Sequence, residues 1–168
     1  SVLTGPGGFG LPAEAHVMRL VLLEIRLPRA LLGAMVGAAL GMSGAALQGY
    51  LRNPLAEPGL IGVTSGASLG AVIAIHTGAA GAFAVALPLG GLIGAALAAA
   101  AVLALSGART GALTLILAGV AVSSVAGALT ALAVNLSPNP FASVEIVFWM
   151  LGSLSDRSLV HVWLAGPF

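Results

Sequence analysis

Long uncharged runs separated by short polar breaks alternate along this chain of 168 residues. The hydrocarbon core of a bilayer is about 30 Å thick and a helix needs roughly 20 residues to cross it, so the runs can be divided by that length. The division predicts membrane-spanning helices at residues 30–51, 59–76, 82–106 and 113–134, and the start of another at 159. We therefore expect an all-α, polytopic transmembrane helix bundle that forms a single partial domain over residues 1–168.

The stretches outside these runs are more polar. Residues 11–25 mix apolar side chains with three charged ones, a pattern that predicts a short helix at the membrane interface. Pro28 suits the first position of a helix and disfavours helix at Leu27, so the first span should begin there. Residues 141–158 are amphipathic and too charged to cross. No methionine precedes Met18, and we expect the chain to be a fragment of a longer protein.

The composition agrees with a membrane protein. Hydrophobic residues make up 59% of the chain and charged residues 7%, against roughly 25% charged in a soluble domain. Cysteine and lysine are absent from the sequence, which excludes disulfides, thiol nucleophiles and Schiff-base chemistry. The net charge of +1 gives no reason to expect nucleic-acid binding. The three histidines stand apart from one another, so we expect no metal site, catalytic residue or cofactor.

Small residues recur at every fourth position in three of the predicted spans. The stripes are Gly33, Gly37, Gly41, Ala45 and Gly49 in the first, Gly62, Gly66, Gly70, Ala74 and Gly78 in the second, and Gly119, Ser123, Gly127 and Ala131 in the fourth. Such stripes let membrane helices approach closely. Tight packing is the first expectation for these stripes, and glycine near a substrate path or at a moving helix contact is the alternative, which the stripes alone do not separate.

The segment "RNPLAEPGLIGVTSGA", residues 52–67, interrupts the apolar sequence. Pro54 should end the first span at about Arg52, and Pro58 can begin the next helix. A helix from Pro58 places Thr64 and Ser65 inside the membrane, whereas a helix capped by either residue leaves only about 18 Å before His76. We expect either one long helix whose hydroxyls bond its own backbone, or a broken helix start shielded by protein or lining a wet pathway.

Residues 26–72 contain the ordered motifs RLPR, GAAL, SGA, LQ, NPLA-x-P and GV-x-SGA. This order resembles the signature region of the permease subunits of bacterial ATP-binding-cassette (ABC) importers for iron-siderophore complexes, haem and cobalamin. The resemblance continues in "LTLILAGVAVSSVAGALTAL", residues 113–132, and in "FWMLGSLSDRSLVHVW", residues 148–163. It extends over nearly the whole chain from residue 15 onward.

The resemblance implies a non-enzymatic subunit of ten transmembrane helices in the bacterial inner membrane, of which this chain has the second to fifth and the start of the sixth. It implies three partners in addition to membrane lipid: a second permease subunit, cytoplasmic ATPase subunits and a periplasmic substrate-binding protein. ATP would be hydrolysed by another chain, because the sequence contains no G-x-x-x-x-G-K loop. An iron-siderophore is the first expectation for the cargo, haem the second and cobalamin the third.

The resemblance also assigns residues. Arg26 and Arg29 match the RLPR arginines that face acidic residues of the binding protein. Candidates for the pathway or the helix break are Gln48, Asn53, Pro54, Pro58, Thr64, Ser65, Ser123 and Ser124. The family orientation puts RLPR on the periplasmic side, opposite to the side that a count of arginines makes cytoplasmic.

Two alternatives remain open. A secondary, ion-coupled transporter would be expected to hold ionisable residues inside its spans. The four complete predicted spans contain no aspartate, glutamate, lysine or arginine, which argues against that mechanism. The other alternative is a non-transporting helical membrane protein held together by its small-residue stripes.

Overall fold

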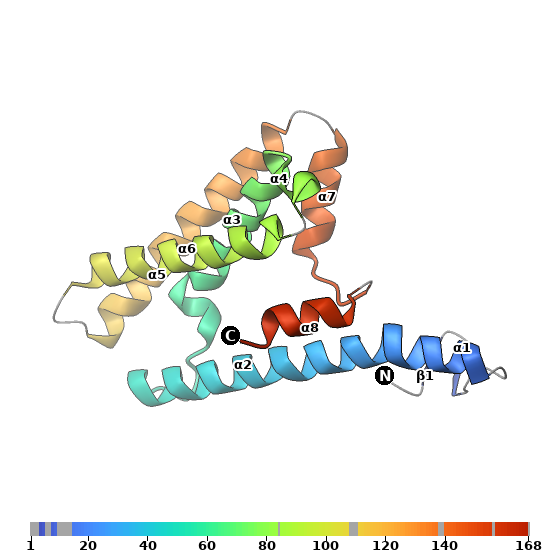
Figure 1. The fold of residues 1–168 in the computed structure, drawn as a ribbon. Coiled ribbons are helices and arrows are strands. Elements are labelled where there is room, and N and C mark those ends of the chain that lie inside the picture. The colour runs from blue at the N-terminus through green and yellow to red at the C-terminus, as the bar shows by residue number, and fades with distance from the viewer. Residues whose placement is uncertain are drawn as a thin grey trace. The chain divides into compact units, whose positions relative to one another are not determined.

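Helices make up nearly all of the described chain (Figure 1). The computed structural model describes residues 4–5, 8–9, 15–83, 85–107, 111–137, 140–155 and 157–167. Strands β1, Thr4–Gly5, and β2, Gly8–Phe9, form a two-residue antiparallel pair. The chain divides into one compact unit of Ser1–Met42 with Ser153–Phe168 and a second of Ser43–Gly152. The all-α prediction is confirmed apart from that short strand pair.

The N-terminal helices form one continuous rod. Helix α1, Ala15–Leu20, leads into the π-helix η1, Val21–Arg26, and then into α2, Leu27–Leu51. The predictions that residues 11–25 form a separate interfacial helix, that Leu27 is not helical and that a helix begins at Pro28 are therefore wrong. Leu27 is helical, with φ −63° and ψ −50°, and its N–H bonds to the Leu22 carbonyl oxygen five residues back. This wider π-helical turn accommodates Pro28, whose ring would clash with the i→i−4 hydrogen-bond pattern of a regular α-helix.

The rod is longer than a membrane is thick. Val17–Leu51 is apolar enough to cross and has 35 residues, equivalent to about 52 Å of helix, against a hydrocarbon core of about 30 Å. Its charged residues all lie before residue 30, and the uncharged residues 30–51 alone are long enough to cross. Within the described residues, two further helices are long and apolar enough to cross, Ala86–Ser106 and Ala112–Asn135.

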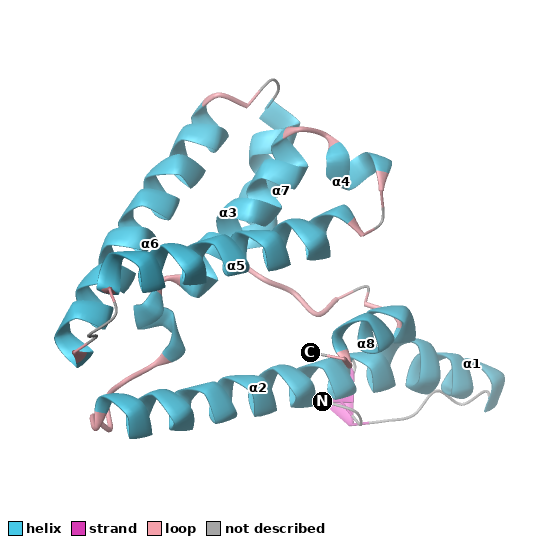
Figure 2. Ribbon diagram, turned by 60° about the vertical axis from the view of Figure 1, so that its left-hand side comes forward, coloured by secondary structure: helices cyan, strands magenta, loops and turns pink. Residues whose placement is uncertain are grey.

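The second unit contains the remaining helices except the last. In order these are the 3-10 helix η2, Pro58–Ile61, then α3, Val63–His76, α4, Ala79–Ala82, α5, Ala86–Ser106, α6, Ala112–Asn135, and α7, Pro140–Met150 (Figure 2). Helix α8, Leu159–Ala165, belongs to the first unit. Helices α5 and α6 lie where the uncharged runs predict helices, and the number of membrane crossings stays a prediction.

Helices α3 and α5 pack backbone against backbone. A Cβ atom built on Gly66 would lie 2.7 Å from the Gly94 carbonyl oxygen, and one built on Gly90 would lie 2.7 Å from the Gly70 carbonyl oxygen. The small-residue stripe of α3 therefore serves close packing. Within its own unit α2 has no such close contact at Gly37 and Gly41, since Cβ atoms built there would meet no described atom of that unit within 4 Å.

Two apolar clusters hold the second unit together. Leu51, Ala56 and Val102 join residues of α6 in the first. In the second, Ile146 of α7 is fully buried against Val72 and Ile75 of α3. The predicted amphipathic segment 141–158 thus contributes helix α7, which packs against the C-terminal part of α3.

Candidate functional site

The C-terminus of α2 is closed by backbone hydrogen bonds around Arg52. The Asn53 N–H bonds to the Gln48 carbonyl oxygen at 3.1 Å and the Arg52 N–H bonds to the Gly49 carbonyl oxygen at 3.4 Å. This is the Schellman pattern, in which the residue after the helix takes a left-handed conformation. Arg52 does so with φ 49°, at a position where glycine is usual. Helix α2 therefore ends at Leu51, and the chain turns away at Arg52, where Pro54 predicts the end of the helix.

The loop after α2 is fixed by its own polar side chains. The Asn53 Oδ1 atom accepts the Leu55 N–H at 3.0 Å, and the Gln48 Nε2 atom donates to the Ala56 carbonyl oxygen at 3.3 Å. Ala56 is buried, whereas Leu55 is 83% exposed. Two of the predicted site residues, Gln48 and Asn53, therefore position a loop that presents an apolar side chain at its tip.

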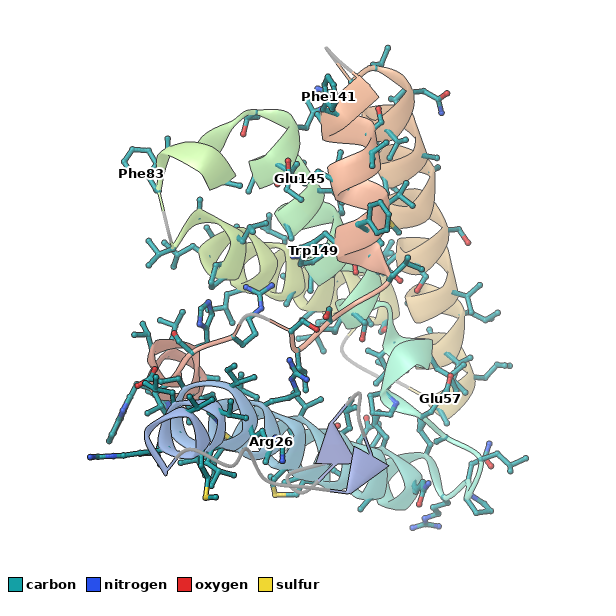
Figure 3. The ribbon with its side chains drawn as sticks, turned by 90° about the vertical axis from the view of Figure 1, so that its right-hand side faces the viewer. Arg26, Glu57, Phe83, Phe141, Glu145 and Trp149 are labelled. Atoms are coloured by element: carbon teal, nitrogen blue, oxygen red, sulfur yellow. The ribbon has the colours of Figure 1, made fainter. Side chains whose placement is uncertain are left out.

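The following helix is broken, which is the second of the two expected arrangements. Glu57, labelled in Figure 3, is extended, and Pro58 begins the short η2. Gly62 then adopts φ 78°, so that α3 starts only at Val63. The 4 residues of η2 and the 14 of α3 correspond to about 8 Å and about 21 Å of helix, so neither piece alone reaches across a hydrocarbon core of about 30 Å.

The break lies directly on α6. A Cβ atom built on Gly62 would be 2.7 Å from the Gly119 carbonyl oxygen and 3.1 Å from the Ser123 Oγ atom. In the other direction, a Cβ atom on Gly119 would be 2.9 Å from the Ile61 Cα atom. Irregular backbone is tolerated at membrane depth where protein shields it, and Gly119 allows that shielding. The sequence placed Gly119 in a stripe but gave no sign of its partner.

The predicted hydroxyl groups divide between two environments. Ser123 lies against the break, beside the first turn of α3, where Thr64 is exposed and Ser65 is half-buried. Ser124 is exposed and donates to the Val120 carbonyl oxygen of its own helix at 2.8 Å. The break thus gathers hydroxyls and the N-terminal end of a helix, groups that hydrogen-bond a passing polar solute. Within the described residues, no cluster of three histidines or carboxylates could hold a metal ion.

The predicted docking arginines lie in the charged part of the rod, before residue 30. Arg26, labelled in Figure 3, is half-buried at the end of η1, and Arg29 is exposed in the first turn of α2. The same unit holds Arg157, whose Nη1 atom is 3.5 Å from the Nε2 atom of His161. His161 caps α8, because its Nδ1 atom accepts the Ser158 N–H at 3.3 Å. This histidine therefore has a structural partner in its own helix.

Known proteins resemble the chain over nearly its full length. An uncharacterised ABC transporter permease of Bacillus subtilis is 43% identical over 168 residues, covering 96% of this chain and 47% of its own. The vitamin B12 import system permease of Klebsiella pneumoniae is 37% identical over 159 residues, covering 95% of this chain and 47% of its own.

A solved structure has the same fold. It is an inward-facing ABC transporter of inferred metal-chelate type, 33% identical, with a TM-score of 0.84 over 96% of this chain and 51% of its own. The chain spans about half the length of these relatives. Together with its three long apolar helices, the similarity makes it a multi-pass membrane protein. The profile of the FecCD transport family matches residues 8–168, and the chain belongs to that family.

Proposed function

We propose that the chain is the N-terminal half of a permease subunit in an ABC importer of the bacterial inner membrane. The importer takes an iron-siderophore or related metal chelate from a periplasmic binding protein and delivers it to the cytoplasm. The observation that carries this proposal is the common fold with the metal-chelate type transporter over 96% of the chain. A second permease subunit and ATPase subunits complete the assembly.

In this function the chain supplies a path and no covalent chemistry. We expect the Thr64, Ser65 and Ser123 hydroxyls, which lie at or beside the break between η2 and α3, to line that path. Gly119 leaves room for the irregular backbone of the break against α6. ATP binding and hydrolysis by the partner subunits shift the assembly between outward-facing and inward-facing arrangements, each with its own helix contacts.

The charged part of the rod receives the binding protein. Arg26 and Arg29 directly precede the uncharged residues 30–51 of the rod, and the family resemblance implies that this end is periplasmic. Two cations there attract carboxylates on the face of a loaded binding protein and speed their encounter. Because this attraction is screened by salt, association of the two proteins should slow as ionic strength rises. A rate independent of salt contradicts the docking role.

Uptake into proteoliposomes tests the function itself. The full-length subunit is reconstituted with its ATPase and binding protein, and labelled ferric siderophore, haem and cobalamin are offered side by side. We expect accumulation that requires ATP and the binding protein and that persists when ionophores abolish ion gradients. Uptake driven by a proton or sodium gradient without ATP would identify a secondary transporter. No uptake of any cargo would favour a non-transporting membrane protein.

A further inference from the structure

The ring of His161 connects the loop before α8, residues 153–158, to the first turn of that helix in the first unit. Its Nδ1 atom lies 3.3 Å from the Ser158 backbone nitrogen and 3.3 Å from the Ser158 Oγ atom, and its Nε2 atom lies 3.5 Å from the Arg157 Nη1 atom. All three residues are half-buried. Within the described residues, the hydrogen bonds of this ring involve Arg157 and Ser158 alone.

These contacts need an imidazole ring without charge. A backbone N–H can only donate, so the Nδ1 atom that accepts the Ser158 N–H carries no proton. In the other neutral tautomer Nδ1 donates to the Ser158 Oγ atom, while Nε2 accepts from the Arg157 guanidinium. A protonated ring has an N–H at both nitrogens, so it cannot accept from Ser158 and turns a positive charge toward Arg157. Protonation therefore removes every acceptor that the ring offers to the loop.

The charged groups of the neighbouring elements are mostly positive. Figures 1 and 2 both show α8 alongside α2, in which Arg29 is the one charged residue. The described charged side chains on the whole rod are Arg19, Glu24, Arg26 and Arg29, and the glutamate is exposed. The side chains of Glu14, His16 and Asp156 lie outside the described part of this unit. Protonation of His161 thus adds a positive charge to a unit whose described charges are four rod residues and Arg157.

The loop that the ring holds lies against the start of α2. A Cβ atom built on Gly33 would lie 3.7 Å from the Leu154 Cδ1 atom. Gly33 follows Arg29 by about one helical turn, and Leu154 stands in the same short loop as Arg157. A change in this loop therefore takes place close to the arginines proposed to receive the binding protein.

We propose that His161 is a pH-sensitive switch between the loop 153–158 and α8. The neutral ring holds Ser158 at the start of α8 and Arg157 beside it, whereas the protonated ring releases the loop. Histidine side chains change charge between about pH 5 and pH 8, and the switch works in that range. Its regulatory effect rests on the proposed function, which makes this end of the unit periplasmic. Acid outside the cell loosens the loop beside the docking arginines and slows association with the binding protein.

A spin label in the loop of the full-length subunit tests the switch in lipid nanodiscs. The 168 residues contain no cysteine and Ser155 is exposed, so Ser155→Cys carries the label once any cysteine in the rest of the subunit is replaced by serine. We expect the mobile fraction of the label to rise several-fold between pH 8 and pH 5. With His161→Gln the label should stay ordered at both pH values, because glutamine accepts the Ser158 N–H as in a capping box and does not titrate. With His161→Ala it should be mobile at both.

His76→Gln is the matched control, because it removes a histidine from the second unit. Its label should respond to pH as in the parent. A mobility in the parent that is the same at pH 8 and pH 5, or a response that persists in His161→Gln, would overturn the switch. An ordered label in His161→Ala at pH 8 would also overturn it, since the loop would then be held without the ring.

Association with the binding protein is measured on the same nanodiscs and tests the regulatory effect separately. The association rate of the parent divided by that of His161→Gln should fall several-fold from pH 8 to pH 5, and titration of the binding protein cancels in this ratio. A constant ratio would contradict the regulation. ATP-driven uptake is measured in proteoliposomes at pH 8. A pH-sensitive label without uptake would count against the proposed function alone, and uptake with a pH-insensitive label would count against the switch alone.

Discussion

Replacing Gly90 by alanine tests how closely α3 and α5 pack. The added Cβ atom would lie 2.7 Å from the Gly70 carbonyl oxygen, 3.2 Å from the Gly70 carbonyl carbon and 3.3 Å from the Ala74 Cβ atom. The first distance is well short of van der Waals contact. The two nearest atoms are backbone and the third is the Cβ atom of an alanine, which has no rotamer to change. The helices must therefore move apart, since no side chain can rotate away.

The cost of the close contact at Gly90 can be measured by comparison with the same substitution at Gly91. A Cβ atom on Gly91 would have one neighbour within 4 Å, the Ala67 carbonyl oxygen at 3.8 Å, which is an ordinary contact. Both changes replace glycine by alanine at successive positions of one helix, so each gains about 0.5–1 kcal/mol of helix preference. That gain cancels in the difference, which leaves the overpacking cost of about 1–3 kcal/mol.

The assay is unfolding of the purified full-length subunit in detergent, followed by helicity as denaturing detergent is added. Gly90→Ala should unfold at lower denaturant, with a stability about 1–3 kcal/mol below that of Gly91→Ala. Gly91→Ala itself should match the parent or exceed it slightly. If the two variants are equally stable, then α3 and α5 do not pack through their backbones at this point, and the close packing inferred for the α3 stripe is wrong.

Three further substitutions have matched controls in the same unfolding assay. Gly62→Ala and Gly78→Ala both place alanine at a positive φ, which should lower the stability by about 1–2 kcal/mol in each variant. Only the alanine at 62 also meets α6, so Gly62→Ala should be less stable than Gly78→Ala by about 1–3 kcal/mol, the cost of overpacking. Arg52→Gly should be about 1 kcal/mol more stable than Arg52→Ala, because both lose the charge and only glycine fits φ 49° without strain. Ile146→Ala should cost about 2–5 kcal/mol because the side chain is fully buried, whereas Val147→Ala, at a half-exposed site, should change little. Equal stabilities of the two variants in a pair would contradict the structural feature that the pair tests: the contact of Gly62 with α6, the left-handed backbone of Arg52 or the burial of Ile146.

The sequence indicated where the chain changes direction because prolines and glycines act locally. Pro54 disfavours helix at Asn53, and Pro58 suits the first position of η2. The break before α3 was one of two expected arrangements for the same reason. The prediction at Pro28 was wrong because a proline can stand either at the start of a helix or inside one. Here it stands inside a helix, next to a π-helical turn whose hydrogen bonds the sequence does not reveal.

The partners of the helix faces could not be predicted. A membrane helix is apolar on every side, so its sequence does not distinguish the buried face from the lipid-facing one. Stripes of equal spacing have different partners: the stripe of α3 meets α5, whereas Gly119 in the stripe of α6 meets the backbone of η2. Ser123 and Ser124 were equivalent as predictions, and only the rotation of α6 separates them.

Charge reversal at the docking arginines tests most directly that this chain receives cargo from a binding protein. In the full-length importer, Arg26→Glu combined with Arg29→Glu should lower ATP-driven uptake at least about tenfold, since close charge pairs between proteins contribute more than 1.4 kcal/mol. Arg19→Glu, an exposed position on the same rod, is the control. Basic residues placed at the acidic positions of the binding protein should restore much of the loss. Uptake by the double variant equal to that of Arg19→Glu would contradict the account.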